Sequence, residues 1–349
     1  MKAALYTGLN QIAVCTVPDP ILTDSYGVIL KVHSCSVCGS DLRIFHHGNP
    51  RVKPPQVIGH EIAGEVVAVG PEVHHLKPGD RVAVGADVPC GECHWCREGL
   101  GNNCQINYAI GYQFHGGYAE YMPLNATTVR FGPVHKIPDG LSFEVAALAE
   151  PLACVINGLE MCRIGLGDTV AVIGAGPAGI MLMKLARSFG ASRVIGVQRS
   201  RARIPEAQRL GGADTIICSQ DGDPVSALLD LTNGEGADVV ITANSSVETH
   251  TQALKMARQR GRINFFGGLP AGSPPIEMSS NLIHYRELLL TGSHGSVPRQ
   301  HRIALDLLAS GVIDGAALIT HTYPLDAITD AFAMAESHAG LKVVVHPQD

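Results

Sequence analysis

The feature that most restricts the fold of this 349-residue chain is a glycine-rich segment, GAGPAG at 174–179, together with its position. A β-branched apolar run at 169–173 precedes the segment, and a helical pattern follows it. In that context the glycines permit a tight turn, close approach of backbone N–H groups to a pyrophosphate, and close packing of helix on strand. The helix N-terminus then faces the phosphate charge. The residues expected to bind a dinucleotide are Gly174, Gly176, Pro177, Ala178 and Gly179, and a purely structural glycine turn is the alternative.

Strand-like and helical segments alternate through the middle of the chain. After the run at 169–173, strands are expected at 193–197, 215–217, 239–242, 262–266 and 288–291, and helices at 201–210, 224–231 and 247–258. Such alternation is typical of a parallel, doubly wound sheet. This part of the sequence therefore predicts an α/β, Rossmann-type domain.

The first 150 residues have a different pattern. They are rich in Gly and Pro and contain short Val- and Ile-rich segments, such as 27–32, 61–69 and 80–84. They show little helical periodicity. This composition predicts a compact β domain. After residue 293 a helical segment at 300–310 and a final strand at 342–345 remain. The chain length is consistent with about two domains.

Charge and hydrophobicity exclude some classes of partner. The chain has 26 basic and 32 acidic residues and a net charge of −6, which gives no strong field for nucleic acid or an anionic membrane. The most apolar stretch, 170–186, is interrupted by glycines, a proline and a lysine, so we expect no transmembrane helix. Gln11 interrupts the N-terminus before the apolar core of a secretory signal can form. We therefore expect a globular, cytoplasmic protein.

Four of the ten cysteines fall within fifteen residues. They are spaced C-x2-C-x2-C-x7-C, and they are Cys90, Cys93, Cys96 and Cys104. In a reducing compartment such spacing suits thiolates that converge on one tetrahedral zinc ion, and a closed four-thiolate site is structural. An iron–sulfur cluster or four unligated cysteines are the alternatives. Cys15, Cys154, Cys162 and Cys218 lie in apolar surroundings and are expected to be ordinary core residues.

A second set of metal-binding residue types is spread along the first 150 residues. Cys38 begins CGSD, His60 and Glu61 belong to GHE, and Glu150 belongs to AEP. Thiolate, imidazole and carboxylate together suit zinc, and three protein ligands plus water define a catalytic site. Each signal alone is weak, because a histidine before a glutamate is commonly a surface residue and Cys35 could instead pair with Cys38.

Taken together, these motifs resemble the zinc-containing medium-chain alcohol and polyol dehydrogenases, similar to sorbitol and threonine dehydrogenases. The resemblance covers essentially the whole chain and rests on CGSD (38–41), GHE (59–61), the four-cysteine loop, GGYAEY (116–121), AEPLA and GAGPAG. It implies a GroES-like β-rich catalytic domain of residues 1–153 and 293–349 around a Rossmann domain at 154–292. It also implies an assembly of two or four identical chains.

The resemblance further implies a catalytic zinc. Cys38 and His60 would be its ligands, with Glu61 and Glu150 in direct contact with the ion or one layer further out, so that each chain would hold two zinc ions. Zinc would lower the pKa of a substrate hydroxyl, and the nicotinamide would accept hydride from the carbinol carbon. Ser40 matches the family position whose hydroxyl carries the substrate proton away. Arg43 stands where relatives often have a relay histidine, and since arginine stays charged, His46 or water would have to complete the path.

The substrate is less constrained by the sequence. Glu150 and the likeness to sorbitol-type enzymes favour a secondary alcohol of a polyol or sugar. The alternatives are a simple alcohol or aldehyde, threonine, or a non-catalytic zinc-binding relative. Phe45, Tyr112, Phe114 and His115 could line a substrate pocket or belong to the barrel core.

The residues after the second strand of the Rossmann segment favour NADP over NAD. NAD-binding folds place Asp or Glu there to hold the ribose hydroxyls. This chain has Gln198 instead, and Arg199 and Arg203 follow. No acid is present to repel a 2′-phosphate, and guanidinium groups are available to bind it. Gln198 could still donate a hydrogen bond to a ribose hydroxyl, so NAD stays an alternative.

Overall fold

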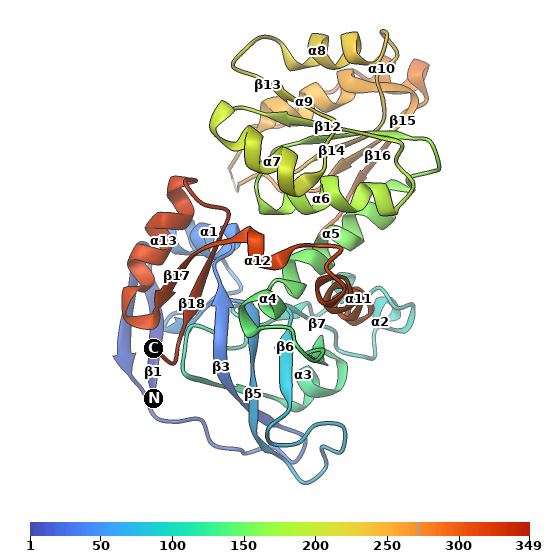
Figure 1. Cartoon of the computed structure of the whole chain (residues 1–349). Helices are drawn as coiled ribbons and strands as arrows, with labels where there is room; N and C mark the ends of the chain where they lie inside the picture. The colour runs from blue at the N-terminus through green and yellow to red at the C-terminus, as the bar shows by residue number, and fades with distance from the viewer. Residues whose placement is uncertain (271) are drawn as a thin grey trace. The chain divides into compact units, whose positions relative to one another are not determined.

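A computed structural model of the chain describes residues 1–270 and 272–349 and separates them into two units. Unit 1 comprises Met1–Cys154 and Gly295–Asp349, and unit 2 comprises Val155–His294. Helix α5 (Ala149–Cys162) contains the boundary between them. Each unit is built around its own sheet system (Figure 1).

Unit 2 contains a six-stranded parallel sheet. Its strands are β11 (Thr169–Ile173), β12 (Arg193–Gln198), β13 (Thr215–Cys218), β14 (Ala237–Thr242), β15 (Ala257–Phe265) and β16 (Leu289–Gly292). Their order is β13-β12-β11-β14-β15-β16, so the strand order reverses beside β11. In sheets of this kind, ligands bind outside the carboxyl ends of the strands at that reversal. The predicted Rossmann fold is therefore confirmed, with the glycine-rich turn at the binding edge.

Helices cover both faces of this sheet (Figure 1). They are α6 (Pro177–Ser188), α7 (Ile204–Gly211), α8 (Pro224–Leu231), α9 (Val247–Met256) and α10 (Ser280–Arg286), with a short 3₁₀ helix η2 (Arg201–Arg203) before α7. The predicted helix at 247–258 ends two residues early, because Ala257 already takes an extended conformation and starts β15. Residues of β11, β12, β14 and β15 form the apolar core beneath the helices.

Unit 1 is rich in β structure. Its largest sheet, in the order β10-β6-β5-β3-β18-β17 with β9 also paired to β3, contains β3 (Val28–Ser36), β5 (Glu61–Val69), β6 (Arg81–Val84), β9 (Tyr121–Leu124), β10 (Val134–Lys136), β17 (Ile319–Pro324) and β18 (Lys342–His346). A smaller sheet contains β1 (Lys2–Gly8), β2 (Gln11–Thr16) and β4 (Gln56–Val57), and β7 (Asp87–Val88) pairs with β8 (Tyr108–Ala109). Because β18 pairs with β3, the C-terminal segment completes a domain begun by the N-terminus.

Unit 1 also contains helices, most of which the sequence pattern did not reveal. They are α1 (Gly39–His47), α2 (His94–Arg97), α3 (Ala126–Phe131), α4 (Phe143–Ala147), α11 (Pro298–Ala309), α12 (Gly315–Leu318) and α13 (Ile328–Ser337), with 3₁₀ turns η1 (Gly101–Asn103) and η3 (Leu325–Ala327). Most are too short to give a clear periodicity. The expected segment at 300–310 corresponds to α11.

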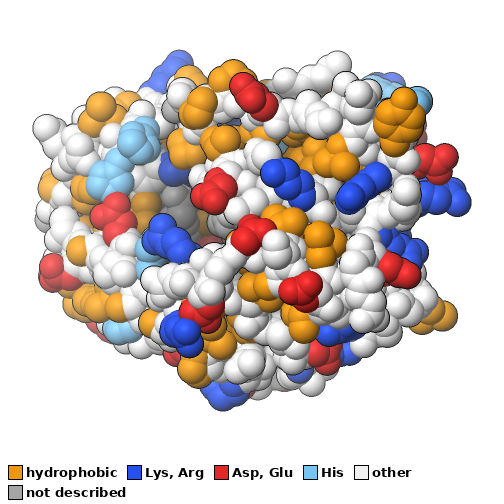
Figure 2. Space-filling view, turned by 90° about the horizontal axis from the view of Figure 1, so that it is seen from above, with side chains coloured by type: hydrophobic (Ala, Val, Ile, Leu, Met, Phe, Trp, Pro, Cys, Tyr) orange, Lys and Arg blue, Asp and Glu red, His pale blue; other side chains and the backbone are white. Residues whose placement is uncertain are grey.

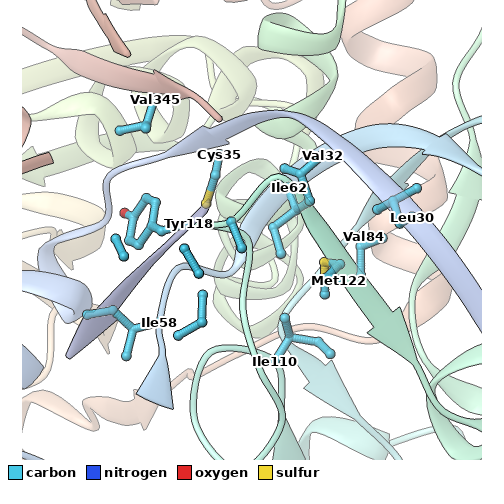
Figure 3. Packing of buried hydrophobic residues seen from close by; sticks show 14 of the residues in the cluster. Leu30, Val32, Cys35, Ile58, Ile62, Val84, Ile110, Tyr118, Met122 and Val345 are labelled. Carbon is cyan, nitrogen blue, oxygen red and sulfur yellow. The ribbon is translucent and has the colours of Figure 1, made fainter. Parts of the chain in front are cut away.

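The core of unit 1 lies between its strands. Leu30, Ile62, Tyr118 and Met122 are almost fully buried there, and Figure 3 shows the hydroxyl-bearing ring of Tyr118 among aliphatic side chains. The expectation that Cys15 is a core residue is wrong: it is exposed, because β2 is an edge strand that buries one face only.

One helical stretch, Phe143–Cys162, is long and apolar enough to cross a membrane by length and composition. It differs from 170–186, which the sequence presented as the most apolar segment. In the stretch Phe143–Cys162, 67% of the most apolar window is buried inside the structure. A buried core helix would pass the same test of length and composition. On the face shown in Figure 2, basic and acidic side chains are interspersed.

Candidate active site and metal centres

The four-cysteine loop brings its sulfur atoms together. The Sγ atoms of Cys90, Cys93, Cys96 and Cys104 all lie within 4.8 Å of one another. Three of the separations are 3.8 Å (Cys90–Cys96), 3.5 Å (Cys93–Cys96) and 4.0 Å (Cys93–Cys104). A tetrahedral zinc with Zn–S bonds of about 2.3 Å separates its sulfur ligands by about 3.8 Å. The loop therefore has the dimensions of a closed zinc site.

Backbone groups of the loop favour charged sulfur. The N–H groups of Cys90 and Cys93 donate to the sulfurs of Cys104 and Cys90, both at 3.4 Å. Backbone hydrogen bonds from Gln105 and Cys96 lower the pKa of the Cys93 thiol to about 6, whereas burial raises the pKa of the Cys96 thiol to about 12. Hydrogen bonds to the charged form favour a thiolate, which is the form that binds metal.

A second group of donor atoms lies elsewhere in unit 1. The sulfur of Cys38, a ring nitrogen of His60 and a carboxylate oxygen of Glu61 lie within 4.8 Å of one another. Cys38 precedes α1, and His60 and Glu61 lie at the start of β5. Gly59 makes this approach possible: its φ is +90°, and a Cβ there would lie 2.8 Å from the Cys35 sulfur and from the Tyr118 ring.

Asp41 connects two of these donors. Its Oδ1 lies 3.2 Å from Nδ1 of His60, and its Oδ2 accepts a hydrogen bond from the backbone N–H of Cys38 at 3.0 Å. Nε2 of His60 is thereby left facing Ser40 and the open side of the donor set. Burial opposes the charged form of His60, but the negative charges of Asp41 and Cys38 together outweigh it and hold the pKa of His60 well above its usual value. The sequence analysis included Asp41 in CGSD without assigning it this role.

The carboxylate of Glu61 is only half satisfied. Its Oε2 accepts hydrogen bonds from Ser36 Oγ and from Nζ of the buried Lys342 on β18. Its Oε1 is buried and has no hydrogen-bond partner in the part of the chain that the structure describes. A buried anionic oxygen without a partner is costly. The donor set and this oxygen fit a bound zinc ion, which would be held by Cys38, His60 and Glu61.

Glu150, in the first turn of α5, lies beside this group but outside it. It is 5% exposed, and one of its oxygens accepts a weak hydrogen bond from Cys154 Sγ at 3.7 Å. Burial raises the pKa of its carboxyl to about 8, and the negative charges of Glu61 and Asp87 act in the same direction. Of the two predicted glutamates, Glu61 therefore belongs to the donor set, whereas Glu150 is not among the atoms that lie within 4.8 Å of one another.

Ser40 lies next to the predicted ligands. Its Oγ is 3.2 Å from Cys38 Sγ and 3.3 Å from His60 Nε2, where a substrate hydroxyl could reach it. His46 has its two ring nitrogens directed at Asn10 and Glu336 in a surface network instead. Both ring nitrogens of His46 are therefore directed at surface partners, and neither is directed at Ser40 as an acceptor of its proton.

Of the side chains expected to line a substrate pocket, Tyr112 is the one with a ring contact to His60 among the described residues. The two ring centroids are 5.9 Å apart. Phe45 packs on Phe332 and Phe114 on Tyr108, so both contribute to the core of unit 1. Nδ1 of His115 lies 3.4 Å from the backbone N–H of Val57.

The glycine-rich turn of unit 2 has the geometry that the sequence predicted. Gly174 has φ +113°, and a Cβ on Gly179 would lie 1.9 Å from the carbonyl oxygen of Gly174. The turn leads into α6, whose N-cap is Gly176. The first N–H groups of this helix lack intrahelical partners and provide a binding place for phosphate.

The residues after β12 surround this turn. Gln198 uses its Oε1 to accept a hydrogen bond from the backbone N–H of Ala175 at 3.0 Å, so its side chain holds the turn. A guanidinium nitrogen of Arg203 lies 4.0 Å from the position of a Cβ on Gly176. Arg199, the residue directly after β12, is exposed. The basic side chain of Arg203 thus lies at the turn itself, and Arg199 follows the end of the strand.

Comparison with sequence families gives two matches. The family described as "Alcohol dehydrogenase GroES-like domain" matches residues 24–139, and "Zinc-binding dehydrogenase" matches 177–310. The chain is 33% identical to D-arabitol-phosphate dehydrogenase of Enterococcus avium, over 97% of this chain and 94% of that protein. It is also 33% identical to sorbitol dehydrogenase of Bacillus subtilis, over 99% and 97%.

Solved structures agree with these matches. A zinc-binding dehydrogenase from Sinorhizobium meliloti, solved with NADP bound, superposes with a TM-score of 0.91 at 32% identity. The superposition covers 99% of each chain. The fold and its two-part organisation are therefore shared over essentially the full length.

Proposed function

This chain belongs to the zinc-containing medium-chain alcohol and polyol dehydrogenases, oxidoreductases that act on CH–OH groups with a nicotinamide cofactor, and we propose that its substrate is a secondary alcohol of a polyol or sugar. The relatives include enzymes named for a neutral polyol, sorbitol, and for a phosphorylated one, D-arabitol phosphate. This range supports the polyol class and leaves the individual substrate open.

One observation carries the proposal. Donor atoms of Cys38, His60 and Glu61 lie within 4.8 Å of one another, and the oxygen of Glu61 that faces no hydrogen-bond donor among the described residues is buried. When bound there, zinc supplies a Lewis acid, and the nicotinamide supplies a hydride acceptor. Three protein ligands leave one position for a substrate oxygen.

The residues of the chain would divide the remaining work. Ser40 Oγ, beside Cys38 and His60, would accept the proton of the substrate hydroxyl. Asp41 would hold His60 in one orientation, so that Nε2 stays directed at the site. In unit 2 the N-terminus of α6 would bind the cofactor pyrophosphate through free N–H groups.

Reduction of NAD and NADP, followed by absorbance, tests the activity against neutral polyols, sugars, phosphorylated polyols, threonine and primary alcohols. The proposal expects the highest kcat/KM for a polyol or sugar. It expects that Cys38→Ser abolishes turnover, whereas the exposed cysteine variant Cys15→Ser does not. Preference for a simple primary alcohol or for threonine would favour those alternatives. Absence of turnover with every substrate would favour a non-catalytic relative.

We further propose that NADP is the preferred cofactor. The chain has Gln198 at the end of β12, where an NAD-binding fold would have Asp or Glu. Arg199 follows it directly, and Arg203 lies at the glycine-rich turn. A charge-assisted hydrogen bond of about 1.5–3 kcal/mol would favour NADP by about ten- to a hundredfold. Arg199→Ala should reduce the NADP-to-NAD ratio of kcat/KM, and Arg209→Ala, exposed on α7, should leave it unchanged. A higher kcat/KM with NAD in the wild type would refute this preference.

Two further properties are proposals of the same kind. We propose two zinc ions per chain, one at each donor set, in a reducing, cytoplasmic compartment that keeps the thiols free. We also propose an assembly of two or four identical chains, which light scattering of the purified protein would test.

A further inference from the structure

Arg51 lies in unit 1 close to the predicted metal ligands. It is half-buried, and its Cζ lies 4.9 Å from the centroid of the Tyr112 ring. That ring is 5.9 Å from the ring of His60, and its hydroxyl interacts with Ser40. Arg51 is therefore one side chain away from the site where the substrate hydroxyl would bind.

The hydrogen bonds of Arg51 all go to neutral acceptors. Its Nη2 donates to the carbonyl oxygen of Asn107, and it lies 3.5 Å from Asn107 Oδ1 and 3.3 Å from Gln113 Oε1. Its Nε is buried and has no partner among the described residues. No carboxylate forms an ion pair with it in residues 1–270 and 272–349. A half-buried guanidinium is thus left with its charge uncompensated.

An uncompensated charge in such a position needs an explanation, because charged groups that leave water are normally paired. Arginine is also the residue best suited to bind phosphate and carboxylate, since its planar group donates two parallel hydrogen bonds. The face of Tyr112 fixes the guanidinium plane, and Asn107 and Gln113 fix one edge of it.

We propose that Arg51 binds an anionic group, a phosphate monoester or a carboxylate, carried by the substrate at a distance from the carbinol carbon that is oxidised. This inference rests on the proposed function, since it assigns the charge of that substrate. It makes Arg51 a residue that determines specificity rather than one that takes part in hydride transfer.

The separation limits the length of the substrate. The distances from Arg51 to Tyr112 and from Tyr112 to His60, placed end to end, set the greatest separation of the guanidinium from the His60 ring. The anionic group and the carbinol carbon must therefore belong to a small substrate, and this limit sets no minimum number of carbons between them.

A purely structural role is the competing explanation, because Arg51 also holds the segment around Asn107 and Gln113. Arg81 provides a matched control for that role. It too is half-buried, stacks on an aromatic ring (Phe143, 4.4 Å) and donates to a backbone carbonyl, that of Leu141. It lies on β6, and its ring partner Phe143 stacks on His33, whereas the ring partner of Arg51 lies beside His60.

The first test compares kcat/KM for a pentitol 5-phosphate, the same pentitol without phosphate, and a short hydroxy acid. The wild type should prefer one of the two anions to the neutral pentitol. Arg51→Gln should reduce that preference about ten- to a hundredfold. Arg51→Lys should restore part of it, and Arg81→Gln should leave it unchanged. If Arg51→Gln lowers all three values equally, the role is structural and the proposal is wrong.

The second test measures binding of the same three compounds to the purified enzyme by calorimetry, independently of turnover. Tighter binding of an anion by the wild type than by Arg51→Gln supports the proposal, and the phosphate and carboxylate arms identify which group is recognised. Equal affinity for the anionic and neutral compounds overturns it. Selective anion binding without turnover of any compound would instead count against the proposed polyol or sugar substrate and leave the anion site intact.

Discussion

Oδ1 of Asp41 lies 3.2 Å from Nδ1 of His60, and both side chains are buried. The other oxygen of Asp41 accepts hydrogen bonds from the Cys38 backbone and, at 2.9 Å, from the Tyr118 hydroxyl. A carboxylate in this position fixes the tautomer and the orientation of a histidine that ligates metal. One buried aspartate therefore lies against two of the three predicted ligands.

Asp41→Asn should weaken the site without removing a predicted ligand. The amide keeps the shape of the side chain but loses the negative charge that supports His60. Such changes typically cost about 10- to 100-fold in metal affinity or activity. Competition with a zinc chelator, read together with kcat/KM, measures the effect. Tyr118→Phe should act in the same direction but less strongly, since the Cys38 N–H still binds Asp41. An unchanged zinc affinity in Asp41→Asn would contradict this role.

The two donor sets should respond differently to loss of a cysteine. Cys38→Ser should remove turnover and leave the free energy of unfolding nearly unchanged, because that site is expected to act on substrate. Cys93→Ser should lower the unfolding temperature, because a closed zinc site contributes folding energy. Thermal unfolding and initial rates on the same preparations separate the two. Equal destabilisation by both variants would show that the sites do not differ in this way.

Ser40→Ala tests the path of the substrate proton. Proton transfer by a positioned side chain typically contributes about 10²- to 10⁴-fold to the rate. We expect kcat to fall within that range while zinc content stays the same, because Oγ is near the predicted ligands and is not counted among them. Ser40→Thr, which keeps the hydroxyl, should recover part of the rate. A wild-type pH–rate profile in Ser40→Ala would mean that the proton leaves by another route.

A pair of histidines away from the metal sites should make stability depend on pH. Nδ1 of His135 on β10 and Nδ1 of His301 on α11 are 3.0 Å apart. Burial lowers the pKa of His135 to about 4, and burial followed by repulsion from His135 lowers that of His301 to about 3. Below pH 6.5 these two histidines bind protons in the unfolded chain but stay neutral in the folded chain. The stabilisation is complete above pH 6.5 and is lost as the pH falls toward 4.

Each histidine should contribute about 1.4 kcal/mol of lost stability per pH unit below 6.5. Urea unfolding at pH 7.5 and 5.5 measures this loss in the wild type and in a variant with leucine at both positions. The free energy of unfolding of the variant should fall less between pH 7.5 and 5.5 than that of the wild type. Because pH affects zinc binding equally in both proteins, that effect cancels in the comparison. An identical loss in the two would show that the pair is not responsible.

The sequence predicted best those features that depend on neighbouring residues. The strand at 169–173, the glycine turn and the helix after it are local, so their pattern reveals them directly, and helix 224–231 was predicted to the residue. The four-cysteine loop is local in the same sense. The confirmed Rossmann fold and family follow from these segments.

The parts that escaped prediction depend on contacts distant in sequence. Lys342 pairs with Glu61 across 281 residues, and no spacing in the sequence indicates such a pair. Asp41 is only three residues from Cys38, yet its role needs His60, which directly precedes strand β5. Arg51 becomes notable only because no ion pair among the described residues includes it, which a sequence does not reveal.

The zinc content of the purified protein tests the central claim most directly. Elemental analysis of the wild type, prepared without chelators, should give two zinc ions per chain, and Cys38→Ser should give one together with complete loss of dehydrogenase activity. A wild type that contains one zinc ion or none, yet oxidises polyols at an undiminished rate after treatment with a chelator, would contradict the account.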